Sequence, residues 1–198
     1  KLEYGLYEIE DKFLILSTEL SKTKLMSYEL EGRLVGSCDG KALENIQCRH
    51  PFKEKNVPII VGPHVTTETG TGLVHTAPAH GVDDYVVGSS YNLPVESQVD
   101  KNGKFIKDTD IVGSLSVWDA NKKIIETLKA NGALVSEENF THSYPHCWRH
   151  KTPIIFRATE QWFIGMDIKN KKKISLRDQA EEVIKKTGFF PNWGEGRL

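Results

Sequence analysis

The chain has 198 residues, of which 38% are hydrophobic and 27% charged, and its formal net charge is −1. This composition is typical of a globular protein with a core of its own and excludes a disordered chain. Because 26 Lys and Arg balance 27 Asp and Glu, contact with a nucleic acid requires a local basic patch. No apolar run approaches membrane-spanning length, so no membrane partner is expected. The three cysteines have unrelated spacings, which argues against a disulfide framework and favours a reducing, cytoplasmic compartment.

In the first third of the chain, apolar alternation predicts a β-hairpin over residues 4–10 and 13–17, with Asp11-Lys12 at the turn. Leucines at helical spacing predict a helix over 18–30. A strand is expected at 33–36, and a short buried strand at 57–61. These elements precede the segment that carries most of the chemistry.

Further along, Asn102-Gly103 within residues 95–105 predicts a type I′ hairpin turn. Residues 118–130 are amphipathic and predict a helix, with Asp119 as N-cap and Asn131-Gly132 as the stop. A last helix is predicted to begin at Ser175 and to end at Gly188. Further strands are predicted at residues 133–135, 140–144, 153–158 and 161–164.

The predicted strands outnumber the helices and do not alternate with them in a βαβ repeat. We therefore expect a mixed α/β fold that is rich in β-structure, with a partly closed, barrel-like sheet and peripheral helices. We also expect residues 1–165 to form the core. Residues 166–198 are expected to form a C-terminal helix and a return segment.

The segment over residues 70–85 places two histidines and two carboxylates on a tightly turning backbone, G-T-G-L-V-H-T-A-P-A-H-G-V-D-D-Y. Its glycines permit close backbone approach, and Pro78 marks a turn. From Val82 a helix is predicted, with Asp83 and Asp84 in its first turn. This junction is a common place for a small-ligand site. Two other interpretations of this segment remain possible. The carboxylates could simply favour the helix N-terminus beside a histidine of the core, or the segment could bind zinc, although histidines five residues apart across a proline are poorly spaced for zinc.

A second polar and aromatic segment, H-S-Y-P-H-C-W-R-H-K-T-P, covers residues 142–153. It is interpreted either as a structured turn or as an RNA contact through Arg149, Lys151 and Arg157. Zinc binding by Cys147 and its neighbouring histidines lacks a second C-x-x-C pair. Neither a G-x-S-x-G elbow, a Walker loop nor a complete dinucleotide fingerprint occurs in the sequence.

Taken together, three motifs resemble the editing domain inserted into isoleucyl-tRNA synthetases, which are class I aminoacyl-tRNA synthetases. They are the segment over 70–85, then S-Y-P-H-C-W-R-H-K-T-P-I-I-F-R-A-T-E-Q-W-F, and P-N-W-G-E-G-R near the end. H-P-F at 50–52 and V-P-I-I-V-G at 57–62 fit the same region. The resemblance covers essentially the whole chain and implies the fold of the Val/Ile/Leu-tRNA synthetase editing domains.

The resemblance implies an enzyme that joins isoleucine to tRNA(Ile) with ATP and magnesium. The part that corresponds to this chain hydrolyses mischarged valyl-tRNA, since valine lacks only one methylene of isoleucine. The implied partners are tRNA(Ile), valyl-tRNA, valine and the rest of the parent synthetase. The resemblance implies no cofactor and no metal for the chain itself.

By position, the resemblance implies that Asp84 anchors the α-ammonium group of the substrate. It implies that His75 lies at the side-chain end of the pocket and helps to reject isoleucine. A carboxylate in a partly desolvated pocket binds an ammonium strongly, and a small pocket excludes an extra methylene by overlap. Further substrate contacts are expected from the same segment: Gly70, Thr71, Gly72, Thr76 and, more weakly, His80. Hydrolysis would proceed by water attack on the ester carbonyl.

One departure is the threonine-rich strand that completes the pocket in the family and has no counterpart in this sequence. We expect both chain ends to be cuts inside a longer protein, with that strand upstream. We therefore expect the isolated chain not to aminoacylate tRNA and to edit poorly or not at all. A non-catalytic tRNA-docking fragment and a metal-dependent hydrolase remain as alternatives.

Overall fold

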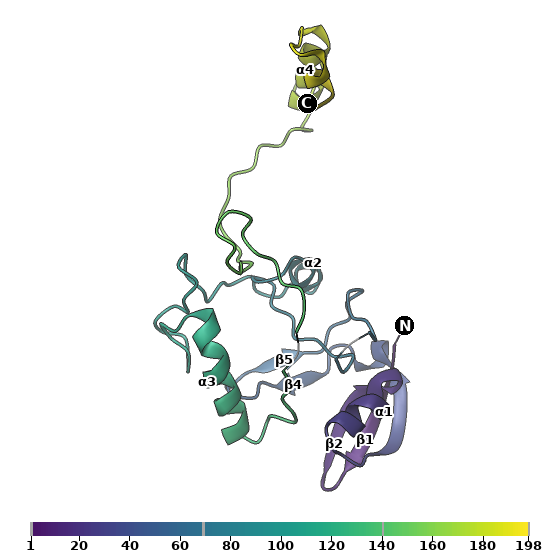
Figure 1. Ribbon diagram of the computed structural model, residues 1–198. Helices are drawn as coiled ribbons and strands as arrows, with labels where there is room; N and C mark the ends of the chain where they lie inside the picture. Colours follow the sequence, from purple (N-terminus) through teal and green to yellow (C-terminus); the bar gives the residue numbers. More distant parts are fainter. Residues whose placement is uncertain (1, 69, 140, 198) are drawn as a thin grey trace. The chain divides into compact units, whose positions relative to one another are not determined.

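The computed structural model describes residues 2–68, 70–139 and 141–197 (Figure 1). The chain divides into two compact units, Lys1–Ala158 and Thr159–Leu198, and each is described by itself. The prediction of a core over 1–165 and a return segment over 166–198 stays a prediction.

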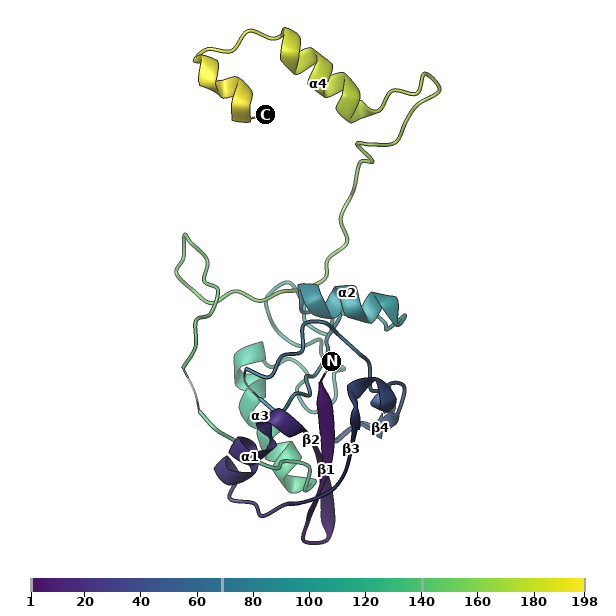
Figure 2. The same cartoon turned by 90° about the vertical axis from the view of Figure 1, so that its right-hand side faces the viewer.

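A three-stranded antiparallel sheet opens the first unit, in the order β2-β1-β3. Its strands are β1 (Glu3–Ile9), β2 (Lys12–Ser17) and β3 (Arg33–Asp39). Helix α1 (Thr18–Ser27) follows β2 directly and packs on the hairpin, as Figures 1 and 2 show. The buried side chains between them are Tyr7, Ile9, Leu16 and Leu25. The hairpin and the first helix are where the apolar pattern predicts them.

A second, two-stranded antiparallel sheet pairs β4 (Gln47–Arg49) with β5 (Asn56–Pro58). The short 3-10 helix η1 (Gly40–Leu43) links it to the first sheet. The mixed α/β class is confirmed. The described residues form two small sheets and no closed barrel, so the barrel-like part of the prediction is unconfirmed.

The strands predicted after residue 130 do not form in the described part of the chain. Between 141 and 158 the pairing is reduced to one isolated bridge, between His146 and Pro153. Pro145 and Pro153 lack the N–H groups that a ladder needs, which limits pairing here. Residue 140, the start of one predicted strand, lies outside the described residues.

Helices α2 (Val82–Ser90) and α3 (Val117–Ala130) form where the sequence predicts them. The N-cap prediction for α3 is wrong: Ser116 caps the helix, and its hydroxyl accepts the backbone N–H of Asp119. Asp119 occupies the N3 position, where its charge still favours the helix start.

The turn before α3 is also different from its prediction. Gly103 has a positive φ of 74°, and Asn102 does not share that conformation. A type I′ turn requires both residues at positive φ. The Gly103 N–H donates to the Asp100 carbonyl, so the chain reverses over residues 100–103 with only the glycine in the left-handed region.

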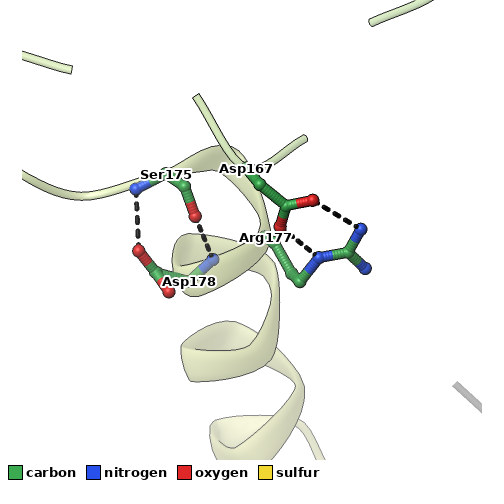
Figure 3. A network of polar contacts seen from close by, with 4 residues as sticks. All are labelled: Asp167, Ser175, Arg177 and Asp178. Atoms are coloured by element: carbon green, nitrogen blue, oxygen red, sulfur yellow. Dashed lines mark hydrogen bonds and ion pairs between the residues drawn. The ribbon is translucent and has the colours of Figure 1, made fainter. Parts of the chain in front are cut away.

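The second unit contains α4 (Leu176–Lys186) and the 3-10 helix η2 (Asn192–Arg197). Ser175 and Asp178 form a capping box at the start of α4, as Figure 3 shows. The backbone and hydroxyl hydrogen bonds from Ser175 lower the pKa of Asp178. Beside them, Arg177 donates to both carboxylate oxygens of Asp167 (2.6 and 3.2 Å), which lowers the pKa of Asp167. Over the described residues, none of the helices has the length and apolar character needed to cross a bilayer.

Candidate functional site

Residues 70–72, the glycine segment, are fixed against the first sheet. Gly72 has a φ of +79°, and a Cβ there would lie 2.6 Å from Ser17 Cβ. The Ser17 N–H donates to Thr71 O (2.9 Å), and the Tyr4 hydroxyl donates to Gly72 O (2.6 Å). Burial raises the pKa of Tyr4. The glycine segment is therefore held by satisfied bonds to β1 and β2.

Residues 75–80 reach a different part of the first unit, a cavity of about 520 Å³. His75, Thr76 and His80 all line it. The opposite walls come from the β4–β5 connection, the residues between α2 and α3, α3 itself and the segment after α3. They include Phe52, Lys53, Gln98, Thr109, Val112 and Phe156. A volume of this size, with mixed apolar and polar walls, is typical of small-ligand sites.

The charges around the cavity are mixed. Lys53, Lys55, Glu96 and Asp110 line it. Desolvation lowers the pKa of His50, and the charges of Lys55, Lys53 and His75 add to the effect. The His50 Nδ1 accepts the backbone N–H groups of Phe52 (3.3 Å) and Lys53 (3.1 Å), which also requires a neutral ring nitrogen. The cavity can thus present a neutral imidazole beside two cationic and two anionic side chains.

Two hydrogen bonds tie the loop over 75–80 to the end of the first unit. His80 Nδ1 lies 3.0 Å from the Phe156 carbonyl oxygen, and the Ala158 N–H donates to Ala79 O (2.7 Å). On its other side the loop packs against α2. Gly88 of α2 lies so close to Pro78 that a Cβ added to the glycine would be 2.5 Å from Pro78 Cγ. Close packing on both sides fixes the path of the loop.

Asp84 lies in the first turn of α2 and does not line the cavity. The Asp84 side chain packs on Gly81, because a Cβ added to this glycine would lie only 2.6 Å from Asp84 Oδ2. Its Oδ1 lies 4.0 Å from His64 Nε2, and the two side chains are 23% and 18% exposed. Sequence reasoning missed His64, since it stands in a loop without periodicity or a recognisable spacing to Asp84.

The second polar segment forms a compact turn. The Cys147 N–H donates to Thr152 O, and the Lys151 N–H donates to Cys147 O (both 2.8 Å). Arg149 lies over the Trp148 ring, 5.0 Å from its centroid. Arg149 and Lys151 are exposed, whereas Arg157 is half-buried. Cys147 Sγ lies 3.3 Å from His150 Nδ1, but the described residues contain no cluster of three or more His, Cys, Asp or Glu suited to a metal.

The residues predicted for the substrate pocket thus occupy three places in the first unit, apart from the tRNA contact candidates of the second polar segment. The glycine segment lies at the sheet, His75 with Thr76 and His80 lies at the cavity, and Asp84 lies beside His64. Within the described ranges, neither a hydrogen bond nor an ion pair joins His75 to Asp84. Their assigned roles stay predictions.

Known proteins resemble this chain over its full length. A family model described as "Leucyl-tRNA synthetase, editing domain" matches residues 29–141, more than half of the chain. The chain is 53% identical to the isoleucine–tRNA ligase of Dechloromonas aromatica, 50% to that of Nitrosomonas europaea and 48% to that of Alkalilimnicola ehrlichii. Each alignment takes in 100% of the chain but only 22%, 22% and 21% of the ligase, respectively, so the chain spans about a fifth of these relatives. The resemblance to isoleucyl-tRNA synthetase editing domains is confirmed, and the chain belongs to the leucyl-tRNA synthetase editing domain family.

Proposed function

We propose that this chain hydrolyses valyl-tRNA(Ile) as the editing domain of an isoleucine–tRNA ligase. The observation that carries the proposal is the loop from His75 to Asp84. It brings two histidines, His75 and His80, to the wall of a cavity and leads into a helix whose first turn holds a half-buried carboxylate. The match to isoleucine–tRNA ligases over the whole chain supports the same function.

In the proposed reaction, Asp84 binds the α-ammonium group of the esterified valine through a charge-assisted hydrogen bond. His75 limits the space at the side-chain end, so an additional methylene is excluded by overlap. Water attacks the ester carbonyl carbon, the bond to the ribose oxygen breaks, and that oxygen takes up a proton. The products are valine and tRNA(Ile) with its terminal hydroxyl restored.

The proposal extends to the longer protein. ATP and magnesium would serve the aminoacylation step of the ligase, outside this chain. The ligase would work in the cytoplasm, with tRNA(Ile) as its nucleic-acid partner and Arg149, Lys151 and Arg157 as candidate tRNA contacts. The exposed Arg149–Trp148 pair supports this contact, because a guanidinium held over an aromatic ring offers both charge and a stacking surface.

The test is hydrolysis of valyl-tRNA(Ile), measured with the chain alone and with the longest polypeptide that its reading frame encodes. Asp84→Asn is expected to lower kcat/KM about 100-fold, because the charged partner of the ammonium is lost. Asp83→Asn is the matched control, since Asp83 is the neighbouring, exposed carboxylate. Equal activity in the two variants would contradict the role of Asp84. Salt-dependent tRNA binding without hydrolysis by either polypeptide would favour the docking alternative.

A further inference from the structure

We infer that the turn before α4 is an RNA-binding element, which holds the phosphate backbone of tRNA through four lysines. These lysines, the lysine tip, are Lys169, Lys171, Lys172 and Lys173. The inference rests on the proposed function, because that function supplies tRNA as the polyanion. Its structural basis is separate, since the tip belongs to the second unit, whereas the cavity and the other candidate tRNA contacts belong to the first.

Charge is distributed unevenly between the two units. Of the 26 Lys and Arg and 27 Asp and Glu, the first unit holds 18 and 21, and the second holds eight and six. Half of the basic residues of the second unit lie in the lysine tip. A chain with a net charge of −1 attracts a polyanion only where positive charge is concentrated locally, and the tip is such a place.

Hydrogen bonds made by Asn170 order the lysine tip. Its side-chain Oδ1 accepts the N–H groups of Lys172 (2.8 Å) and Ile174 (3.3 Å). The Lys173 N–H donates to Asn170 O (2.9 Å), and the Asn170 N–H donates to Ile174 O (3.0 Å). Lys173 completes the reversal with a positive φ of 61°. The lysines therefore project from one closed turn, so less backbone entropy is lost when a ligand binds them.

The base of the turn is fixed to the start of α4. The Arg177 N–H donates to Met166 O (3.0 Å), and the Arg177 guanidinium pairs with Asp167 (Figure 3). Ser175 is buried and forms the capping box with Asp178. The two carboxylates that flank the tip in sequence are thus engaged with the arginine and with the helix start.

The four ammonium groups of the tip are available to a ligand. All four residues are exposed, and over the described ranges of the chain none of them forms an ion pair. The pKa of Asp178 is lowered mainly by its hydrogen bonds with Ser175, and the charge of Lys169 adds only a minor effect. By contrast, Lys186 of the same unit pairs with Glu182. Four like charges on one turn repel each other, and a bound polyanion relieves that repulsion.

The chemistry of the tip fits a chain of phosphates. An extended polyanion can engage several lysines at once and releases its condensed counterions on binding. A lysine ammonium recognises phosphate as a point charge and reads no base edge. The tip would therefore add affinity for tRNA and help to position it, without selecting tRNA(Ile) over other tRNAs.

The experiment measures binding of fluorescently labelled tRNA(Ile) to the 198-residue chain by anisotropy, between about 50 and 200 mM KCl. The tip variant combines Lys169→Gln, Lys171→Gln, Lys172→Gln and Lys173→Gln. It is expected to bind about 100-fold more weakly at the lower salt concentration, and the slope of log K against log [KCl] should become less steep by about 3. Arginine at the same four positions keeps the charge and should retain the affinity within about twofold.

The matched control removes the same charge from exposed lysines of the first unit. It combines Lys101→Gln, Lys104→Gln, Lys122→Gln and Lys123→Gln. Both quadruple variants have the same net charge, so the control should keep most of the affinity for tRNA if the position of the lysines matters. Equal losses in the two variants would show that only total charge acts, and would overturn the inference.

Two other results would overturn it. One is unchanged affinity in the tip variant, or no tRNA binding by the unaltered chain. The other is binding to vesicles of phosphatidylcholine and phosphatidylserine that is as tight as binding to tRNA and is lost in the tip variant, which would assign the tip to a membrane surface. The proposed function is judged separately, by hydrolysis of valyl-tRNA(Ile) in the unaltered protein. Failure of hydrolysis with intact, tip-dependent tRNA binding would contradict the proposed function and support the inference.

Discussion

The two halves of the segment over 70–85 differ in how their polar groups are used. In the glycine segment, the Thr71 and Gly72 carbonyls both accept hydrogen bonds from the first sheet. From His75 to Asp84, two histidine side chains line a cavity, and the Asp84 carboxylate lies 4.0 Å from the His64 imidazole without a hydrogen bond to it. A single run of motif residues can therefore combine a part that builds the fold with a part left open for a ligand.

The sharpest test of this comparison uses the two glycines with positive φ. Gly72→Ala is expected to cost about 3 kcal/mol of unfolding free energy, because a left-handed alanine is strained and its Cβ meets Ser17. Gly70 has nearly the same φ (+78°) but open space around its Cβ. Gly70→Ala should therefore cost only about 1 kcal/mol. Urea denaturation measures both, and equal losses would show that packing on the sheet is not what fixes the glycine segment.

The other half is tested by Gly81→Ala. The new Cβ would lie 2.6 Å from Asp84 Oδ2 and must displace the carboxylate, without positive-φ strain at position 81. We expect hydrolysis of valyl-tRNA(Ile) to fall about tenfold, since small displacements of a binding group are costly. Gly36→Ala, where a Cβ meets nothing within 4 Å, serves as the control. Unchanged hydrolysis in a folded Gly81→Ala protein would mean that the position of Asp84 is unimportant.

The hydrogen bond between Tyr4 and the glycine segment should contribute less to the free energy of unfolding than the packing of Gly72 on the sheet. Tyr4→Phe removes the donor to Gly72 O and is expected to lower the unfolding free energy by about 1 kcal/mol. Tyr7 is similarly buried, at 7% against 8% for Tyr4, and no bond from its hydroxyl holds the glycine segment. Tyr7→Phe should therefore change stability less than Tyr4→Phe. The reverse order would show that the hydroxyl of Tyr4 does not hold the glycine segment.

The smallest effect is expected at the cavity, from His50. Its pKa in the folded protein lies below its ordinary value of 6.5, with desolvation as the main cause. As the pH falls through that value, the unfolded chain binds the proton first, so the free energy of unfolding decreases. His50→Asn keeps a side-chain acceptor and removes the titration. The variant should lose less stability than the unaltered chain between pH 7 and pH 5 in thermal or urea unfolding, and identical pH profiles would contradict the assignment.

The sequence predicts those elements correctly whose signal lies within a few neighbouring residues. The β1–β2 hairpin follows from alternation, and α4 follows from Ser175 and its capping box. The predicted strands after residue 130 fail because a strand also needs a partner. The sequence holds the apolar runs but does not show which segment would pair with them. The cap of α3 was misplaced by three residues because Ser116 and Asp119 are both favoured caps.

The site was predictable only along one stretch of chain. The loop over 75–84 was found from its residue types and its resemblance to a family. His64 precedes Asp84 by 20 residues, and Gln98 joins the cavity from beyond α2; nothing in local spacing connects either of them to the loop. Such groupings arise from tertiary packing, which a single sequence does not display.

The hydrogen bond from Ala158 to Ala79 turns one amide into a reporter on the loop. An amide proton exchanges with solvent only when its bond opens. Release of Ala79 would therefore appear as faster deuterium uptake at Ala158, far along the chain from the loop itself. Ligands that tighten the loop would slow that uptake, so occupancy of the site could be followed from a single backbone position without labelling any residue in it.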